Sequence, residues 1–206
     1  SLKAYDLRAL VAILADRGWG ANVVSPGEWA SARTAGVPTE RTTFEGVGKT
    51  DADLKVAVDS AAAGNALRWL AVESADELAQ LVTLHRAARS EAGHDVDLAV
   101  LLRLNPEVQP ETSPGLAVGR ADSKFGLSAA DVESLAAGNR WQGGLRLRGI
   151  HVHMGSNLGD VRSWALAGRR AVELLDRVRR RYDGPGVPDV VDFGGGHQCR
   201  VAFPGP

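Results

Sequence analysis

Two short segments of the chain carry side chains that suit a flat, negatively charged ligand. Residues 151–156 read His-Val-His-Met-Gly-Ser and residues 192–196 read Asp-Phe-Gly-Gly-Gly, and each follows an apolar, strand-like run (145–150 and 187–191). An imidazole can stack on an aromatic ring, a serine hydroxyl can donate to a phosphate, and glycines let backbone N–H groups approach anionic oxygens. Two strand ends that converge on one anion predict a cofactor-binding barrel.

The elements that must position these side chains alternate between strand-like and helix-like patterns. Strands are expected at residues 1–4, 21–24, 41–44, 67–72, 96–104, 145–153 and 189–193. Helices are expected at residues 7–17, 26–35, 50–63, 74–92, 128–137 and 161–182. The fourth helix opens on Ser-Ala-Asp-Glu (74–77), the pattern of a capping box.

This alternation implies parallel strands joined by crossover helices. The two candidate folds are an open doubly wound sheet and a (β/α)₈ TIM-type barrel. Polar or glycine residues follow nearly every strand, whereas an open sheet gathers its ligand signals at one switch point. The polar or glycine residues that follow the expected strands are Lys3, Ser25, 46–49, Arg103, 153–156 and 194–196. We therefore expect one domain over residues 1–206, an incomplete barrel truncated at both ends, because seven strand-like segments fall one short of closure.

Composition narrows the classes of partner. The net charge of −1 gives no reason to expect a nucleic acid or an anionic membrane as partner. No apolar run approaches the roughly 18 residues of a membrane-spanning helix, and no signal-peptide pattern opens the chain. The single cysteine, Cys199, excludes an internal disulfide framework, so a cytoplasmic location is expected.

Seven stretches, in order along the chain, carry a resemblance to a known family. They are Ser-Leu-Lys-Ala (1–4), Val-Val-Ser-Pro-Gly-Glu (23–28), Gly-Val-Gly-Lys-Thr (46–50), Leu-Leu-Arg-Leu-Asn-Pro (101–106), Ser-Lys-Phe-Gly-Leu (123–127) and the two segments at 151–156 and 192–196. Together they resemble the barrel domain of the fold-type III pyridoxal-phosphate decarboxylases, which include the diaminopimelate, ornithine and arginine decarboxylases. The likeness is greatest to the diaminopimelate type.

The resemblance implies pyridoxal phosphate as cofactor and assigns two catalytic residues. Lys3 would form the Schiff base with the cofactor aldehyde, and an incoming amino group would displace it. His153 would stack on the pyridine ring, with His151 as a supporting neighbour on the same side of the strand. The plainer alternatives are a solvated terminal lysine and two satisfied polar histidines at a barrel rim.

Further cofactor contacts follow from the same resemblance. Ser156, Gly194, Gly195 and Gly196 match the phosphate site, although a glycine triplet can also be a flexible turn. Arg103 ends the most apolar strand, where a lone guanidinium would be costly, so it needs an anionic partner. The family places it near the phenolic oxygen of the cofactor or near the carboxylates that hold the arginine.

Five other charged residues are weaker candidates. Lys124 resembles a lysine of subunit contacts but is equally well explained as a solvated loop lysine, and Lys49 is likewise a weak candidate. Glu28, Glu45 and Asp192 could be acid/base carboxylates, but helix capping or strand-end ion pairs explain them better.

The chain also departs from the family's pattern. Asn22 stands where an aspartate is usual, Val47 where a polar residue is frequent, and residues 197–200 (His-Gln-Cys-Arg) are unusually polar. The acidic partner of the pyridine nitrogen, the Pro-Gly-Arg after it, and the cysteine and tyrosine of the C-terminal β-domain are expected beyond position 206. We therefore expect the 206-residue chain alone to be inactive.

The resemblance implies that the parent protein decarboxylates a small-molecule amino acid as a homodimer. The expected reaction is meso-diaminopimelate to lysine, with ornithine, arginine or a carrier-bound amino acid as alternative substrates. A racemase on the same barrel is a second possibility, against which the segments at 123–127 and 151–156 argue. A non-catalytic pyridoxal-phosphate carrier is a third, and it would need a closed barrel, for which the sequence shows no eighth strand.

Overall fold

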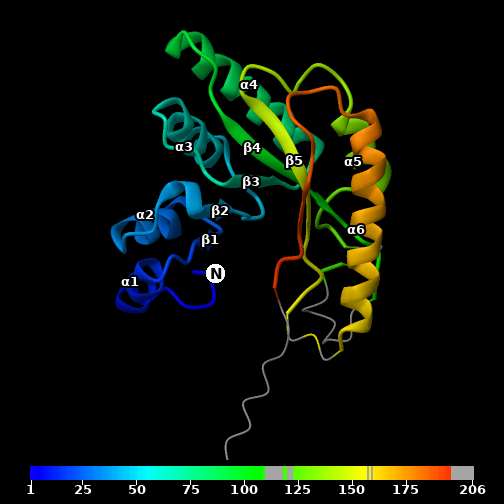
Figure 1. The fold of residues 1–206 in the computed structure, drawn as a ribbon, viewed down its shortest axis with the longest axis horizontal. Helices are drawn as coiled ribbons and strands as arrows, with labels where there is room; N and C mark the ends of the chain where they lie inside the picture. The colour runs from blue at the N-terminus through cyan, green and yellow to red at the C-terminus, as the bar shows by residue number, and fades with distance from the viewer. Residues whose placement is uncertain (110–117, 120–122, 157, 159, 196–206) are drawn as a thin grey trace, which may run out of the picture.

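Six parallel strands form one sheet in a computed structural model that describes residues 1–109, 118–119, 123–156, 158 and 160–195 (Figure 1). The strands are β1 (Ala21–Val23), β2 (Thr42–Phe44), β3 (Trp69–Val72), β4 (Leu98–Leu104), β5 (Leu145–Val152) and β6 (Val190–Asp192). Each strand pairs with the next one along the chain. The strand order never reverses, which is the order of a barrel wall and excludes the doubly wound alternative.

Helices connect the strands and cover the outer face of this sheet (Figure 1). They are α1 (Arg8–Asp16), α2 (Pro26–Thr34), α3 (Asp51–Ala62), α4 (Ala75–Ala92), α5 (Ala129–Ala136) and α6 (Arg162–Arg181), with a 3₁₀ turn at Thr39–Arg41. Leu70, Leu102, Ile150 and Leu174 are fully buried in one continuous core between sheet and helices. None of the described helices is long and apolar enough to cross a membrane.

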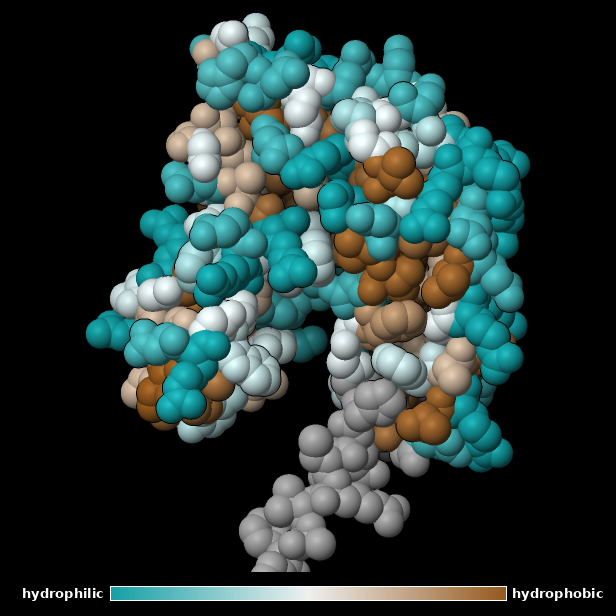
Figure 2. All heavy atoms as spheres, viewed as in Figure 1, coloured by the Kyte–Doolittle hydropathy of each residue, from teal (hydrophilic) through white to brown (hydrophobic). Residues whose placement is uncertain are grey.

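The surface reflects this layering (Figure 2). Hydrophilic side chains cover most of the outside, and apolar side chains gather between α6 and the strands. A second apolar group lies over α1, where Val11 is the one buried residue of the helix. Leu7, at the N-cap, and Leu10 are 54% and 40% exposed, so these apolar side chains contribute little to the core.

The residues at the helix starts explain where the helices begin. Ser25 accepts from the backbone N–H of Glu28, whose carboxylate in turn accepts from the backbone of Val24, so the capping role expected for Glu28 is confirmed. Thr50 and Asp53 form a complete capping box on α3. The box predicted at 74–77 is only half formed, because the Glu77 carboxylate lies against Lys49 instead of returning to the cap.

The strand expected at residues 1–4 is wrong. These residues form a turn, and one backbone hydrogen bond, from Leu2 N to Asn22 O (3.0 Å), ties them to β1. A strand needs a ladder of such bonds, and a single one is seen in the described residues. The other expected strands and helices are present with ends shifted by up to two residues.

An irregularity between β4 and β5 decides which residues face inward. The pairing runs Val100 with Leu147 but Leu101 with Gly149, so Arg148 is an extra residue in β5. Before the bulge Leu145 and Leu147 pack outward on the helices, and after it Ile150 and Val152 do. Gly149 has φ 155°, and a Cβ there would lie 1.9 Å from Val190 O, so only glycine fits at the bulge.

Candidate functional site

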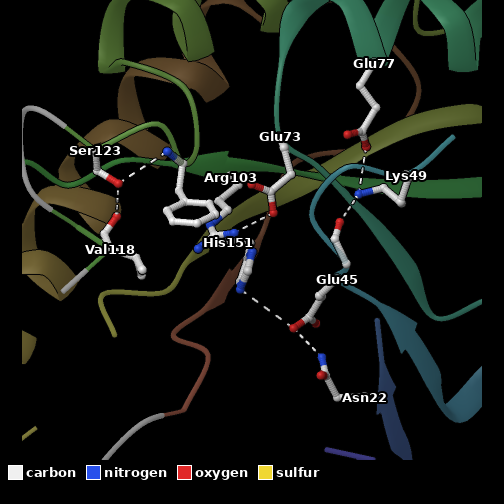
Figure 3. A network of polar contacts seen from close by, with 11 residues as sticks. Asn22, Glu45, Lys49, Glu73, Glu77, Arg103, Val118, Ser123 and His151 are labelled. Carbon is white, nitrogen blue, oxygen red and sulfur yellow. Dashed lines mark hydrogen bonds and ion pairs between the residues drawn. The ribbon is translucent and has the colours of Figure 1, made fainter. Parts of the chain in front are cut away.

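Polar side chains meet at the carboxyl ends of the strands, on the inner face of the sheet. Parallel strands end at a common edge, so the residue that follows each strand reaches the same region. Five of these side chains are labelled in Figure 3: Asn22, Glu45, Glu73, Arg103 and His151. A sixth, Asp192, stands at the end of β6. The backbone bond between Leu2 and Asn22 brings Lys3 to the same edge.

The sheet is strongly curved at this edge. Glu45 follows β2 and Asp192 ends β6, and four inter-strand steps of a flat sheet would span about 19 Å. The donor atoms of Glu45, His151 and Asp192 nevertheless all lie within 4.8 Å of one another. The six strands therefore bend as part of a barrel wall, which confirms the expected fold class.

Arg103 has the anionic partner that its position predicted. Its guanidinium donates to Glu73 Oε1 at 2.6 Å, and the two side chains are 5% and 9% exposed. The ring of Phe125 lies 5.4 Å from the same guanidinium. Because a buried charge is tolerated only when it is paired, the Glu73 carboxylate stabilises the Arg103 guanidinium at the end of β4.

A second buried ion pair lies further out. Lys49 Nζ contacts Glu77 Oε1 at 2.8 Å and donates to Gly46 O at 2.5 Å. Burial raises the pKa of Glu77, although the neighbouring Lys49 ammonium opposes the shift. The pair ties the loop after β2 to the first turn of α4, so Lys49 is a structural residue.

Glu45 is held on both of its oxygens. The side-chain amide of Asn22 donates to Glu45 Oε2 and also to Thr43 Oγ1 (3.1 Å). The indole N–H of Trp69 donates to Glu45 Oε1 at 3.1 Å. The carboxylate is thereby fixed on the inner face, with Oε2 3.7 Å from His151 Nε2 (Figure 3).

Protonation at this cluster is set mainly by burial. Burial lowers the pKa of His151 to about 3, although nearby Asp192 opposes the shift. Burial and the neighbouring Glu45 carboxylate raise the pKa of Asp192. His151 is therefore neutral, and the raised pKa of Asp192 favours the protonated form of that carboxyl group beside Glu45. Donor atoms of these types also bind divalent metals, but a proton on Asp192 satisfies the same arrangement.

His153 lies against Gly194 and is near enough to Lys3 for the lysine charge to act on its imidazole. Burial lowers the pKa of His153 to about 4, and the nearby charges of Arg103 and then Lys3 act in the same direction. A Cβ on Gly194 would lie 2.8 Å from His153 Nδ1, and the residue has φ 61°. The structure thus brings Lys3, a neutral and half-buried imidazole, and the first glycine of the triplet to one place.

The remaining predicted residues border this place. Ser156 is exposed just beyond β5, and Gly195 is exposed with nothing within 4 Å of where its Cβ would stand. The backbone N–H of Gly194 is already bonded to Asp192 Oδ1 (2.7 Å). Gly196 and residues 197–200 lie outside the described residues.

A family model described as "Pyridoxal-dependent decarboxylase, pyridoxal binding domain" matches residues 1–202. The chain belongs to this family. The cofactor of this domain is accordingly pyridoxal phosphate.

Similar proteins agree with this assignment. The pyridoxal-binding domain is 37% identical over 215 residues to the diaminopimelate decarboxylase of Actinosynnema pretiosum, covering 98% of this chain and 46% of that protein. It is 33% identical over 196 residues to the Zymomonas mobilis enzyme of the same name, covering 95% and 43%. A crystal structure of Helicobacter pylori diaminopimelate decarboxylase complexed with L-lysine matches with a TM-score of 0.69 and 25% identity, covering 84% of this chain and 41% of that one. The chain therefore spans less than half the length of these relatives.

The side chains of the domain fit pyridoxal phosphate. His151 Nδ1 is buried and has no hydrogen-bond partner among the described residues, so it can accept from a ligand. Open space beside Gly195 leaves room for a phosphate, and the neutral ring of His153 can lie against a pyridine. Two surface hollows lie elsewhere, one beside the 3₁₀ turn and one between the end of β4 and α6.

Three acidic residues at or near the carboxyl ends of the strands were not predicted as part of the site. Glu45 was interpreted as a strand-end ion pair, and Glu73 and Glu77 were given no role at the site. Glu45 and Glu73 each stand directly after a strand. That position is the signal that could have found both.

Proposed function

We propose that the protein binds pyridoxal phosphate through Lys3 and decarboxylates an amino acid. The observation that carries this proposal is the meeting of Lys3, neutral His153 and Gly194 at the carboxyl edge of a barrel-like sheet. Family membership favours a decarboxylase over the racemase and over the non-catalytic carrier.

Each side chain would have one role toward the cofactor. The Lys3 amine would hold the aldehyde carbon, and the neutral imidazole of His153 would lie against the ring. Ser156 and the backbone of Gly194, Gly195 and Gly196 would bind the phosphate. When bound, pyridoxal phosphate supplies the electron sink for the electron pair left as CO₂ departs.

Arg103 would supply a fixed positive charge at the same edge. Its ion pair with Glu73 leaves further guanidinium N–H groups that can donate to an anionic oxygen of the cofactor. Because Arg103 disfavours protonation of His153, it also keeps that imidazole neutral.

The substrate we propose is meso-diaminopimelate, with lysine as product. The relatives named diaminopimelate decarboxylase and the Helicobacter pylori structure with L-lysine support this choice over ornithine, arginine or a carrier-bound amino acid. We also propose that residues 1–206 are the barrel part of a cytoplasmic homodimer that has a C-terminal β-domain. On this proposal the 206-residue chain alone releases no CO₂.

The test uses the protein expressed from its complete reading frame. The purified protein should show the absorbance band of bound pyridoxal phosphate, and Lys3→Ala should abolish it. Lys55→Ala is the matched control, because Lys55 is exposed on α3 and pairs with Asp59 away from the site. CO₂ release should be fastest with meso-diaminopimelate. A band that persists in Lys3→Ala would refute the assignment of Lys3, and faster release from ornithine or arginine would refute the substrate.

A further inference from the structure

Residue 22 is a hydrogen-bond donor at the point where the family usually has an acid. The Asn22 amide donates to Glu45 Oε2 and to Thr43 Oγ1, and both acceptors follow or belong to the neighbouring strand β2. An ionised carboxylate only accepts hydrogen bonds, so an aspartate could not replace this amide without placing two carboxylates in contact. The asparagine therefore supplies Glu45 with a donor where an aspartate would add a second acceptor.

The Glu45 carboxylate is oriented as well as charged. Trp69 holds its second oxygen from β3, so both oxygens have donors on neighbouring strands. The oxygen shared with Asn22 faces His151 Nε2 at 3.7 Å, and the two side chains are 8% and 3% exposed. A buried, immobile carboxylate this close favours an N–H on the facing ring nitrogen.

We propose that Asn22 and Glu45 form a positioning pair that fixes His151 as the Nε2–H tautomer and so orders the end of β5 that carries His153. Which nitrogen of a histidine carries the proton is set by the groups that face the ring. Here Glu45 Oε2 lies 3.7 Å from Nε2, and Asp192 is the other carboxyl group beside the ring. The tautomer leaves the buried Nδ1 as an acceptor without a partner among the described residues.

The register of the sheet carries this effect to the cofactor edge. His151 pairs with Arg103 of β4 on one side and with Asp192 of β6 on the other. His153 stands two residues further on and on the same face. A fixed His151 ring therefore helps to hold the end of β5 in place between β4 and β6. That this order affects cofactor affinity rests on the function proposed above.

Exchange of charge between the two positions tests the pair. In the complete protein, Asn22→Asp should lower pyridoxal-phosphate affinity by about tenfold or more, because it places two buried carboxylates in contact. The double variant Asn22→Asp/Glu45→Gln restores one donor and one carboxylate, so it should recover the thermal stability lost in Asn22→Asp. It should not recover the cofactor affinity, because position 45 no longer presents a carboxylate to His151. Asn65→Asp is the matched control, because Asn65 is exposed in the loop after α3.

A second readout separates positioning from general stability. The ¹⁵N chemical shifts of His151 should report the Nε2–H tautomer in the unaltered protein and a mixture of tautomers in Glu45→Gln. A merely structural Glu45 would leave the tautomer unchanged. The proposal is overturned if the unaltered protein shows the Nδ1–H form, if Asn22→Asp behaves like Asn65→Asp, or if the double variant is no more thermally stable than Asn22→Asp.

The two proposals fail in different ways. Failure of the unaltered protein to bind pyridoxal phosphate would overturn the proposed function. The tautomer of His151 and the recovery of thermal stability in the double variant can still be measured without cofactor, so they decide on the positioning pair by themselves.

Discussion

Gly194 lies directly against the imidazole of His153, so close that a Cβ on the glycine would stand 2.8 Å from Nδ1 and 3.0 Å from Val152 O. The residue also has φ 61°, a conformation that other residues adopt at a cost. The absence of a side chain at Gly194 thus lets the residues after β6 pack closely against the end of β5. The position of the His153 ring depends on this close packing.

Gly194→Ala should therefore destabilise the protein more than an ordinary substitution of a left-handed glycine. Gly186→Ala is the matched control, because Gly186 has φ 80° with nothing within 4 Å of its Cβ position. We expect about 1 kcal/mol for the control from backbone conformation alone and about 2–4 kcal/mol for Gly194→Ala. Urea unfolding measures both, and equal losses would show that the contact with His153 has no effect.

Gly195→Ala should separate ligand binding from folding. No atom lies within 4 Å of its Cβ position, so we expect the midpoint of thermal unfolding to be unchanged. If the backbone there approaches the cofactor phosphate, a methyl group should weaken pyridoxal-phosphate affinity several-fold. Fluorescence titration with the cofactor measures the affinity, and unchanged affinity would remove Gly195 from the phosphate site.

Arg103→Met should be strongly destabilising even without cofactor. It leaves the Glu73 carboxylate buried without its partner, and breaking a buried pair in this way costs about 3–5 kcal/mol. Arg89→Met is the control, since the Arg89–Asp95 pair is exposed (50% and 65%) and should contribute about 1 kcal/mol or less. A second change, Glu73→Leu, should recover much of the loss in Arg103→Met, and urea unfolding of the three variants tests this.

Acidification should destabilise the cofactor-free protein between about pH 6.5 and pH 4. His153 has a pKa lowered to about 4 in the folded state, so the unfolded chain binds a proton in this window that the folded chain does not. Stability therefore falls as pH falls, by about 1.4 kcal/mol per pH unit for each such histidine. The lowered pKa of His151 acts in the same direction, while the raised pKa of Asp192 opposes it.

The variant His153→Gln isolates the contribution of His153 to the pH dependence of stability. Its unfolding free energy, measured by urea at several pH values, should depend less steeply on pH between 6.5 and 4 than that of the unaltered protein. Parallel slopes for the two proteins would show that His153 is not buried in its neutral form.

The sequence was sufficient to predict what local rules determine. Alternation along a strand placed His151 and His153 on one face, and the cost of a buried guanidinium predicted an anionic partner for Arg103. The strand order followed from the repeated alternation of strands and helices. These features depend on neighbouring residues or on one general energy term, so a single sequence contains them.

The contacts across the sheet could not be predicted in the same way. Glu45 meets His151 and Asp192 only because the sheet curves through several strands, and the inward direction of His151 depends on the bulge at Arg148. The curvature has no local sequence signal, and Gly149 inside the expected strand is the local sign of the shift in pairing. The turn at residues 1–4 was mistaken for a strand for a related reason, since a ladder depends on the partner strand.

Because strand order equals chain order, each βα unit delivers one chemical group to a shared rim: an amide from β1, carboxylates from β2 and β3, a guanidinium from β4, imidazoles from β5 and a carboxyl group from β6. Exchange of one unit for that of a relative would alter a single group and leave the others in place. The site is thus assembled from interchangeable parts, and the Asn22–Glu45 pair marks two neighbouring parts that must change together.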